Sequence, residues 1–305
     1  MRLAALLALV LVGTTGCAAF TDDARADGRV TVAAAFYPLA FVAQRVGGND
    51  VSVTNLTQPG AEPHDLELTI KETAEIADAD LVMLLHGFQP AVDDAVEQVA
   101  AGEVLDVADV VDLETSEEHA DDHGDEAGDH GDEDPHFWHD PDRMAVLTEA
   151  VADELVEIDP DHADTYRSNA EELVGELHDL TAAYEQGLSG CERNTVVVSH
   201  DAFGYLERFG LHIEGIAGLS PDAEPTPADL ARLQDLIHDE GISTVFSERL
   251  VSPRLAQTLA EDMGVTTAIL DPIEGLSDET SDEDYLSLMR ENLGALELAN
   301  GCPAS

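Results

Sequence analysis

Two spacings of apolar residues alternate along residues 30–107. Short β-branched runs predict buried strands, and apolar residues three or four positions apart predict helices between them. The predicted strands are residues 30–35, 51–56, 80–85 and 104–107, and the predicted helices are residues 38–46, 70–77 and 90–100. Strands that alternate with helices in this way indicate a parallel sheet covered by helices.

The same alternation returns in residues 195–298. The predicted strands are residues 195–199, 211–216, 243–246 and 266–270, and the predicted helices are residues 201–209, 227–238, 253–263 and 282–298. Between the halves, apolar residues recur every three or four positions from Tyr166 to Tyr184, which predicts one long helix within residues 159–189. The predicted fold class is α/β: an N-terminal lobe (29–158) and a C-terminal lobe (190–305), each with a mostly parallel sheet, joined by that linker helix.

Residues 1–17 are typical of an export signal. Met1 and Arg2 precede an apolar run over residues 3–12, which is too short to cross a bilayer, and small residues lead from it to Cys17. Thr-Thr-Gly before Cys17 resembles a lipobox, in which the cysteine is lipidated and anchors the protein on the outer face of the membrane. A simple cleaved signal is the alternative. Residues 18–28 then form a polar tether, so we expect an exported protein.

The charge balance of the chain limits its possible partners. The chain has 65 Asp and Glu residues against 13 Lys and Arg residues, a formal net charge of −52. Such a chain cannot neutralise a row of phosphates, which excludes nucleic acid as a partner. Like charges repel one another in the folded state and salt screens them, so we expect a halophilic protein. We also expect a monomer.

Two cysteines remain after the export signal, Cys191 and Cys302. Disulfides persist outside the cytoplasm, and two thiols can pair without a remainder. We therefore predict a disulfide between Cys191 and Cys302, with two separate buried thiols as the alternative.

Side chains that suit a metal ion stand at or just after the predicted strands. Ligands bind at the carboxyl edge of an open parallel sheet. Each histidine is a weak signal alone, but three imidazoles and one carboxylate can form a closed tetrahedral site for Zn²⁺. The candidate metal ligands are His64, His136, His200 and Asp271.

These residues lie within motifs that follow one another along nearly the whole chain. They include Pro-Gly-Ala-Glu-Pro-His-Asp-Leu-Glu around His64 and Asp-Pro-His-Phe-Trp around His136, within the segments 36–39, 47–50, 59–67, 79–82, 134–138, 199–203 and 270–272. In this order they resemble the zinc/manganese substrate-binding lipoproteins of ABC importers. The resemblance implies two α/β lobes bridged by one long helix, a divalent metal in the cleft between them, and metal ligation by His64, His136, His200 and Asp271.

The resemblance also implies a function and partners. A member of this family is not an enzyme: it binds a metal outside the cytoplasm and presents it to an ABC permease and its ATPase subunit. Manganese-selective members carry a carboxylate where this chain has His200, so the imidazole favours Zn²⁺ over Mn²⁺. A manganese carrier or a metal-dependent adhesin of the same fold is the alternative. A secreted zinc hydrolase with Glu248 or Glu62 as base is a remote one, because no His-Glu-x-x-His motif is present.

Three further side chains are auxiliary candidates. Glu248 ends a predicted strand and can hydrogen-bond a ligating imidazole, or it can form a charge pair with Arg249. His139 can compete with His136 for the metal or face solvent. His86 follows another predicted strand, and its imidazole can support a ligand.

Residues 114–134 are low in complexity, with 11 acidic residues and three histidines. Such a composition buries too little apolar surface to fold, so we expect a mobile loop. Histidine-rich tracts bind metals loosely, and His119, His123 and His130 can capture Zn²⁺ for transfer to the cleft. An acidic, solvated insertion with incidental histidines is the alternative.

Overall fold

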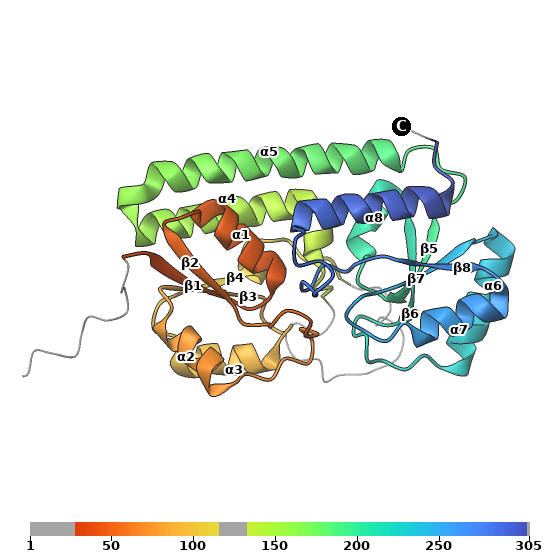
Figure 1. Cartoon of the computed structure of the whole chain (residues 1–305), viewed down its shortest axis with the longest axis horizontal. Helices are drawn as coiled ribbons and strands as arrows, with labels where there is room; N and C mark the ends of the chain where they lie inside the picture. Colours follow the sequence, from red (N-terminus) through yellow and green to blue (C-terminus); the bar gives the residue numbers. More distant parts are fainter. Residues whose placement is uncertain (1–27, 116–132, 304–305) are drawn as a thin grey trace, which may run out of the picture.

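The computed structural model describes residues 28–115 and 133–303. Its strands form two parallel sheets, one in each half of the chain (Figure 1). This confirms the predicted α/β class and the two sheets. Cys17 and the histidines of the acidic segment, His119, His123 and His130, lie outside the described residues, so the statements about them stay predictions.

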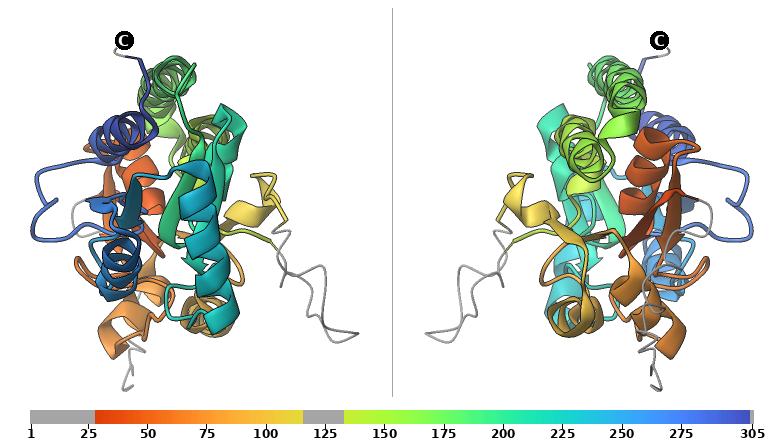
Figure 2. Two further views of the ribbon diagram at one scale, coloured as in Figure 1. Left: turned by 90° about the vertical axis from the view of Figure 1, so that its right-hand side faces the viewer. Right: turned by 90° about the vertical axis from the view of Figure 1, so that its left-hand side faces the viewer.

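The first sheet has the spatial order β2-β1-β3-β4. Its strands are β1 (Val30–Ala34), β2 (Val51–Asn55), β3 (Leu81–Leu84) and β4 (Glu103–Asp106). Every residue of β3 is buried, as expected for a parallel sheet covered on both faces. Helix α1 (Tyr37–Gly47) lies on one face, and α2 (Ile70–Asp78) and α3 (Pro90–Val99) lie on the other (Figures 1 and 2).

The second sheet repeats this order as β6-β5-β7-β8. Its strands are β5 (Thr195–His200), β6 (His212–Ala217), β7 (Thr244–Ser247) and β8 (Thr266–Ile269). Helices α6 (Pro227–Glu240) and α7 (Arg254–Met263) lie on one face, and α8 (Tyr285–Asn300) lies on the other (Figure 1). In each sheet the chain moves first to one side of its opening strand and then to the other. Ligands bind beyond the carboxyl ends of the strands at such a switch in strand order.

One long helix spans both lobes (Figure 1). Helix α5 (Ala163–Gly187) runs above both sheets, packed against α4 (Pro141–Ile158) and α8 (Figure 1). The predicted linker over residues 159–189 starts late, because a 3₁₀ turn, η4 (Pro160–His162), separates α4 from α5.

Helix α4 was missed by the sequence analysis. Its signals are present in the sequence: Pro141 stands in the first turn, and the Asp140 side chain caps the helix by accepting from the N–H of Asp142 at 2.9 Å. The side chains that it buries recur at helical spacing, and they include Met144, Leu147, Val151 and Leu155.

The predicted helix over residues 201–209 is wrong in type and extent. The structure has a 3₁₀ helix there, η5 (Gly204–Phe209). Residues 201–203 instead turn sharply after β5, with the N–H of Asp201 bonded to the carbonyl of Gly218 at 3.1 Å and that of Ala202 to the carbonyl of His200 at 2.9 Å. These bonds belong to the turn after β5, and regular helical structure starts only at Gly204.

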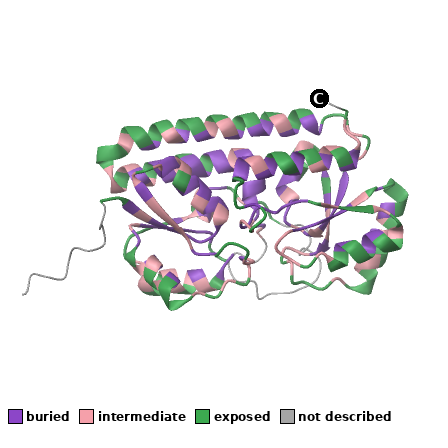
Figure 3. Cartoon of the chain, in the orientation of Figure 1, coloured by how far each residue is buried: buried purple, intermediate pink, exposed green. Residues whose placement is uncertain are grey.

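One apolar core extends through both lobes. It joins side chains from the first sheet, the long helices and β5, for example Leu84, Leu173 and Val198. Buried residues occur in the sheets and helices of both lobes (Figure 3). A second, smaller apolar cluster lies between the second sheet and helices α6 and α7. A disulfide joins Cys191, which follows α5, to Cys302 after α8, as the sequence predicts. None of the helices within the described ranges combines the length and apolarity needed to cross a bilayer.

Candidate metal centre

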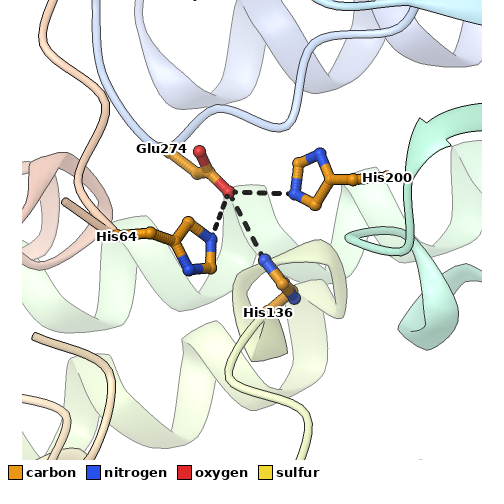
Figure 4. Close-up of side chains that lie close together, drawn as sticks. All are labelled: His64, His136, His200 and Glu274. Atoms are coloured by element: carbon orange, nitrogen blue, oxygen red, sulfur yellow. Dashed lines mark ion pairs between the residues drawn. The ribbon is translucent and has the colours of Figure 1, made fainter. Parts of the chain in front are cut away.

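Four side chains from distant parts of the chain meet between the two lobes. His64 lies in the segment between β2 and α2, and His136 immediately precedes the 3₁₀ helix η3 (Phe137–His139). His200 is the last residue of β5, and Glu274 lies in the segment between β8 and α8. Figure 4 shows the three imidazoles around one oxygen of the Glu274 carboxylate.

The spacing of the facing atoms suits a single metal ion bound by all four groups. Glu274 Oε1 lies 3.4 Å from His64 Nε2, 3.4 Å from His136 Nε2 and 3.5 Å from His200 Nε2. All four ligand atoms lie within 4.8 Å of one another. Zinc bonds of about 2.0–2.2 Å place neighbouring atoms of a tetrahedron about 3.4 Å apart. One ion at the centre can therefore contact all four groups with small movements.

The facing atoms are buried and lack hydrogen bonds. His64 Nε2, His136 Nε2, His200 Nε2 and Glu274 Oε1 have no hydrogen-bond partner within residues 28–115 and 133–303. The side chains of His136 and His200 are 0% exposed and that of Glu274 is 2% exposed. A buried polar atom without a partner costs about 1–3 kcal/mol, so four at one point indicate a site built for an additional group.

Carboxylates fix the ring orientation of two imidazoles. His136 Nδ1 lies 2.7 Å from Asp134 Oδ1, and His200 Nδ1 lies 2.7 Å from Glu248 Oε1. A carboxylate accepts from the protonated nitrogen, which leaves the Nε2 lone pair for a metal. This pairing is common behind metal-binding histidines.

A family model described as "Zinc-uptake complex component A periplasmic" matches residues 32–299. The chain belongs to this zinc-uptake component A family. The matched range includes all four residues of the site and both sheets except the first two residues of β1.

Relatives of known name agree with the family. The chain is 35% identical over 305 residues to the zinc-binding lipoprotein AdcA of Streptococcus pneumoniae strain R6, with 97% of this chain covered, but it spans only 60% of that protein. It is 32% identical over 301 residues to the high-affinity zinc uptake system protein ZnuA of Bacillus subtilis, covering 94% of this chain and 93% of that protein.

Solved structures share the zinc-uptake component A fold. The Zn(II)-bound AdcA of Streptococcus pneumoniae aligns with a TM-score of 0.75 and 32% identity, over 91% of this chain and 59% of AdcA. The laminin-binding protein Lmb of Streptococcus agalactiae, described as an adhesin with metal-transporting activity, aligns with a TM-score of 0.79 and 29% identity, over 88% of this chain and 99% of Lmb.

The structure corrects the carboxylate of the predicted ligand set. His64, His136 and His200 come together as the sequence predicts, but the fourth member of the group is Glu274 and not Asp271. The Asp271 carboxylate is engaged elsewhere: Oδ2 lies 2.8 Å from Arg249 Nε, and Oδ1 accepts the N–H of Ile273 at 2.8 Å. Both oxygens of Asp271 are therefore occupied by protein donors.

Glu274 was missed because a turn decides where it points. Ile273 has a positive φ of 58°, an outlier for a β-branched residue, and this turn follows Asp271 and Pro272 directly. Strained backbone of this kind concentrates at functional sites. The sequence gives one signal, a second carboxylate three residues after Asp271 in the same loop, followed by Gly275.

The auxiliary candidates have separate positions. Glu248 holds His200, as described above, and is not joined to Arg249 by a described ion pair. His139 lies outside the group of four: it is fully buried, and its ring lies against that of Phe203 with centroids 4.7 Å apart. The structure therefore does not support His139 as a ligand or as a solvent-facing residue.

His86 lies at a pocket beside the site. Its half-exposed imidazole is 3.5 Å from Asp93 Oδ1. The pocket has a volume of about 200 Å³ and is lined by residues of both lobes, including His64, His86 and Ser220. The side chain of His64 is 13% exposed, so it is the member of the four nearest to solvent.

The ionisable groups of the site shift one another's pKa. Burial opposes the charged form of His200, but the carboxylates of Glu248 and Glu274 outweigh burial and raise its pKa to about 10. Burial likewise opposes charge on His136, and Asp134 outweighs it to raise the pKa of His136. Burial also opposes charge on Glu274, but the surrounding imidazoles hold its pKa well below the usual value. The group therefore favours an anionic carboxylate facing positive charge, which a metal cation can supply in place of protons.

Proposed function

We propose that the protein is the extracytoplasmic substrate-binding component of an ABC-type zinc importer. In this role it binds one Zn²⁺ between its lobes and delivers the ion to a membrane permease. The observation that carries the proposal is the convergence of three unpaired Nε2 atoms on one unpaired carboxylate oxygen at 3.4–3.5 Å. Membership of the zinc-uptake family and the zinc-binding names of relatives support it.

Zinc fits the donor set better than manganese. Imidazole suits Zn²⁺, whereas Mn²⁺ favours carboxylate and water oxygens in six-coordinate sites. Three imidazoles and one carboxylate leave a zinc site with a net charge of +1 on its first shell.

Binding, rather than turnover, follows from the number of ligands. Catalytic zinc sites usually have three protein ligands and keep a position open for water. Here four side chains are placed to fill a tetrahedron. Glu248, a candidate base for a hydrolase, is committed to the far nitrogen of His200. We therefore propose a carrier and not a hydrolase.

The partners and the location of the protein follow from this role. We propose that residues 1–17 direct export, that lipid on Cys17 holds the protein on the outer face of the membrane, and that an ABC permease with its ATPase receives the ion. The lipoprotein name of the AdcA relative supports this assignment.

A competition titration tests the proposed function. The chain without residues 1–17 is stripped with a chelator and titrated with Zn²⁺ and with Mn²⁺ against a fluorescent chelator. We expect one tight zinc site, much weaker manganese binding, and loss of the tight site in the double variant His136→Ala/His200→Ala. The matched control, His162→Ala, removes an exposed histidine that pairs with Asp159 far from the site. Tight zinc binding that persists in the double variant would refute the proposal.

A further inference from the structure

The segment that carries Glu274 is held by unusual contacts. It follows β8, and its residues Leu270 to Gly275 are buried. Ile273 takes its positive φ directly before Glu274. A β-branched side chain is disfavoured there, so the surroundings must stabilise the turn.

Asp271 supplies the main support of this turn. Its carboxylate Oδ1 accepts the N–H of Ile273 at 2.8 Å, which bonds the carboxylate to the turn that directs Glu274. Its backbone is held from both sides by one side chain of α8: the N–H donates to Asn292 Oδ1 at 2.9 Å, and the carbonyl accepts from Asn292 Nδ2 at 2.7 Å. Asn292 thus fixes the backbone of Asp271, two residues before the turn at Ile273 along the chain.

Arg249 completes the support from the second sheet. Its Nε lies 2.8 Å from Asp271 Oδ2, and its side chain is only 14% exposed. A second contact, from Arg249 to Glu291 at 2.8 Å, ties the guanidinium to α8. Because the guanidinium of Arg249 is bound by two carboxylates, its side chain can adopt few other conformations. It can therefore fix the orientation of the Asp271 carboxylate.

Arg249 also stands next to the residue that orients His200. Glu248 holds His200 Nδ1 at 2.7 Å, and Arg249 holds Asp271 at 2.8 Å. Two consecutive residues after β7 thus support the two members of the site that come from the C-terminal lobe: Glu248 contacts His200 directly, and Arg249 contacts the segment that carries Glu274.

The Glu274 segment is tied to the other lobe as well. Trp138 Nε1 donates to the carbonyl of Pro272 at 2.7 Å, and Trp138 lies two residues after His136. The Tyr285 hydroxyl in turn donates to the carbonyl of Trp138 at 2.6 Å. These bonds fix the turn at Ile273 relative to the segment that carries His136.

We infer that Asp271 and Arg249 are positioning residues for Glu274: their ion pair holds the turn at Ile273 and so places the Glu274 carboxylate opposite the three imidazoles. This inference rests on the proposed zinc site and assigns to Asp271 a role other than ligation. Residues behind a metal ligand typically account for a 10–100-fold change in affinity.

Substitutions separate the parts of this support. Asp271→Ala removes both contacts, and we expect zinc affinity to fall about 10–100-fold. Asp271→Asn keeps one oxygen for the Ile273 N–H and loses the ion pair, whereas Arg249→Met loses the ion pair with Asp271 together with the contacts of Arg249 to Glu291 and Glu279. Both should lie between Asp271→Ala and the unaltered chain. Arg45→Met is the matched control, because it removes a partly buried arginine paired with Glu176, away from the site, and should leave affinity unchanged.

Two readouts distinguish positioning from a general loss of stability. The visible spectrum of bound Co²⁺ depends on the ligands and on the coordination number, so it should change in Asp271→Ala as water takes the place of Glu274, and it should weaken if additional waters bind. In a double-mutant cycle, Asp271→Ala should have no further effect on zinc affinity in a Glu274→Ala background, because it acts through Glu274.

Two results would overturn the inference alone. One is unchanged zinc affinity and Co²⁺ spectrum in folded Asp271→Ala and Arg249→Met, beside tight binding by the unaltered chain. The other is the same loss of affinity from Asp271→Ala with and without Glu274. Failure of the unaltered chain to bind Zn²⁺ would overturn the proposed function, and the inference with it.

Discussion

His136 and His200 each use one ring nitrogen for the protein and leave the other for a metal. Carboxylates at 2.7 Å hold the Nδ1 atoms, and Glu274 draws positive charge to the Nε2 side. The same carboxylates that orient the rings also raise the pKa of both imidazoles. Protons and metal therefore compete for the same atoms.

Zinc binding should release protons. The pKa of His200, raised to about 10 once the carboxylates outweigh burial, means that this imidazole is protonated at neutral pH without metal, and Zn²⁺ needs it neutral. Zinc affinity should therefore rise with pH up to about pH 10, with release of roughly one proton or more per ion. Calorimetry in two buffers with different heats of ionisation measures this number. Equal heats in both buffers would contradict the expected release.

His139 should destabilise the fold. It is fully buried, and neither of its ring nitrogens makes a hydrogen bond of ordinary geometry within the described residues, although the Pro272 carbonyl lies close enough to favour its charged form. Replacing His139 with Leu should raise the free energy of unfolding by about 1–3 kcal/mol, because an unpaired buried polar group is removed. Burial, with a contribution from nearby His136, lowers the pKa of His139 to about 3.

The sign of the pH effect follows from this pKa. When the pKa of a histidine is lower in the folded state than in the unfolded state, the unfolded state takes up the proton first. The free energy of unfolding therefore decreases as pH falls below about 6.5. The advantage of His139→Leu should therefore grow between pH 7 and pH 5, as measured by urea unfolding. His162→Leu is the control, since His162 is half-exposed and paired with Asp159. A His139→Leu variant that is less stable, or that loses zinc affinity, would contradict this assignment.

The sequence pointed to the three imidazoles because they stand in specific motifs at or after predicted strands. It did not choose correctly between Asp271 and Glu274. The two carboxylates lie three residues apart, and the choice depends on the turn at Ile273 and on a contact from Arg249, 22 positions earlier in the chain. A local pattern cannot show a turn that a distant side chain stabilises.

The elements bring these residues together through repetition. Both sheets place the opening strand second in space, so both have a switch in strand order at their carboxyl edge. Strand and helix alternation was predicted correctly for most of the chain because buried parallel strands are short apolar runs. Helix α4 was missed although Asp140 and Pro141 mark its start, and residues 201–209 were assigned to one helix although only residues 204–209 are helical, in a 3₁₀ helix.

The acidic segment should affect capture and not equilibrium binding. Its flanks, Thr115 and Glu133, form an isolated antiparallel bridge, so a short Gly-Ser turn can replace residues 117–132. All four residues of the site lie outside that segment, and the zinc affinity of the site should stay within about twofold. We expect slower zinc uptake by cells at limiting metal, because loosely binding histidines are lost.

A matched replacement isolates the histidines of this segment. Substituting His119, His123 and His130 by Asn keeps the length and the acidic charge. Unchanged uptake in both variants at limiting zinc would leave the segment as a solvated insertion, whereas a defect in the deletion alone would assign the effect to charge or length.

The whole molecule combines a shared core with a large negative charge. Side chains of both lobes and of the long helices form one apolar cluster, so we expect the lobes to move little relative to each other. Repulsion between like charges opposes the packing of this core, because the chain has 65 acidic residues and only 13 basic ones. Several of the few arginines, among them Arg143, Arg208 and Arg249, are used in ion pairs within the fold.

Salt should stabilise the protein. The Debye length falls from about 10 Å at 0.1 M salt to about 3 Å at 1 M, which screens repulsion between surface carboxylates. The melting temperature should rise by several degrees between these KCl concentrations, since 1 kcal/mol corresponds to roughly 2–4 °C for a domain of about this size. Scanning calorimetry measures the change, and sucrose controls for stabilisation without screening. A melting temperature that is flat or falls with KCl would exclude salt adaptation.

The position of zinc in a crystal of the loaded protein, located by anomalous scattering at the zinc edge, tests the proposed site. We predict one peak between the lobes, about 2.0–2.2 Å from the Nε2 atoms of His64, His136 and His200 and from a carboxylate oxygen of Glu274. A peak bound by Asp271 in place of Glu274, or no peak at these four side chains, would contradict it.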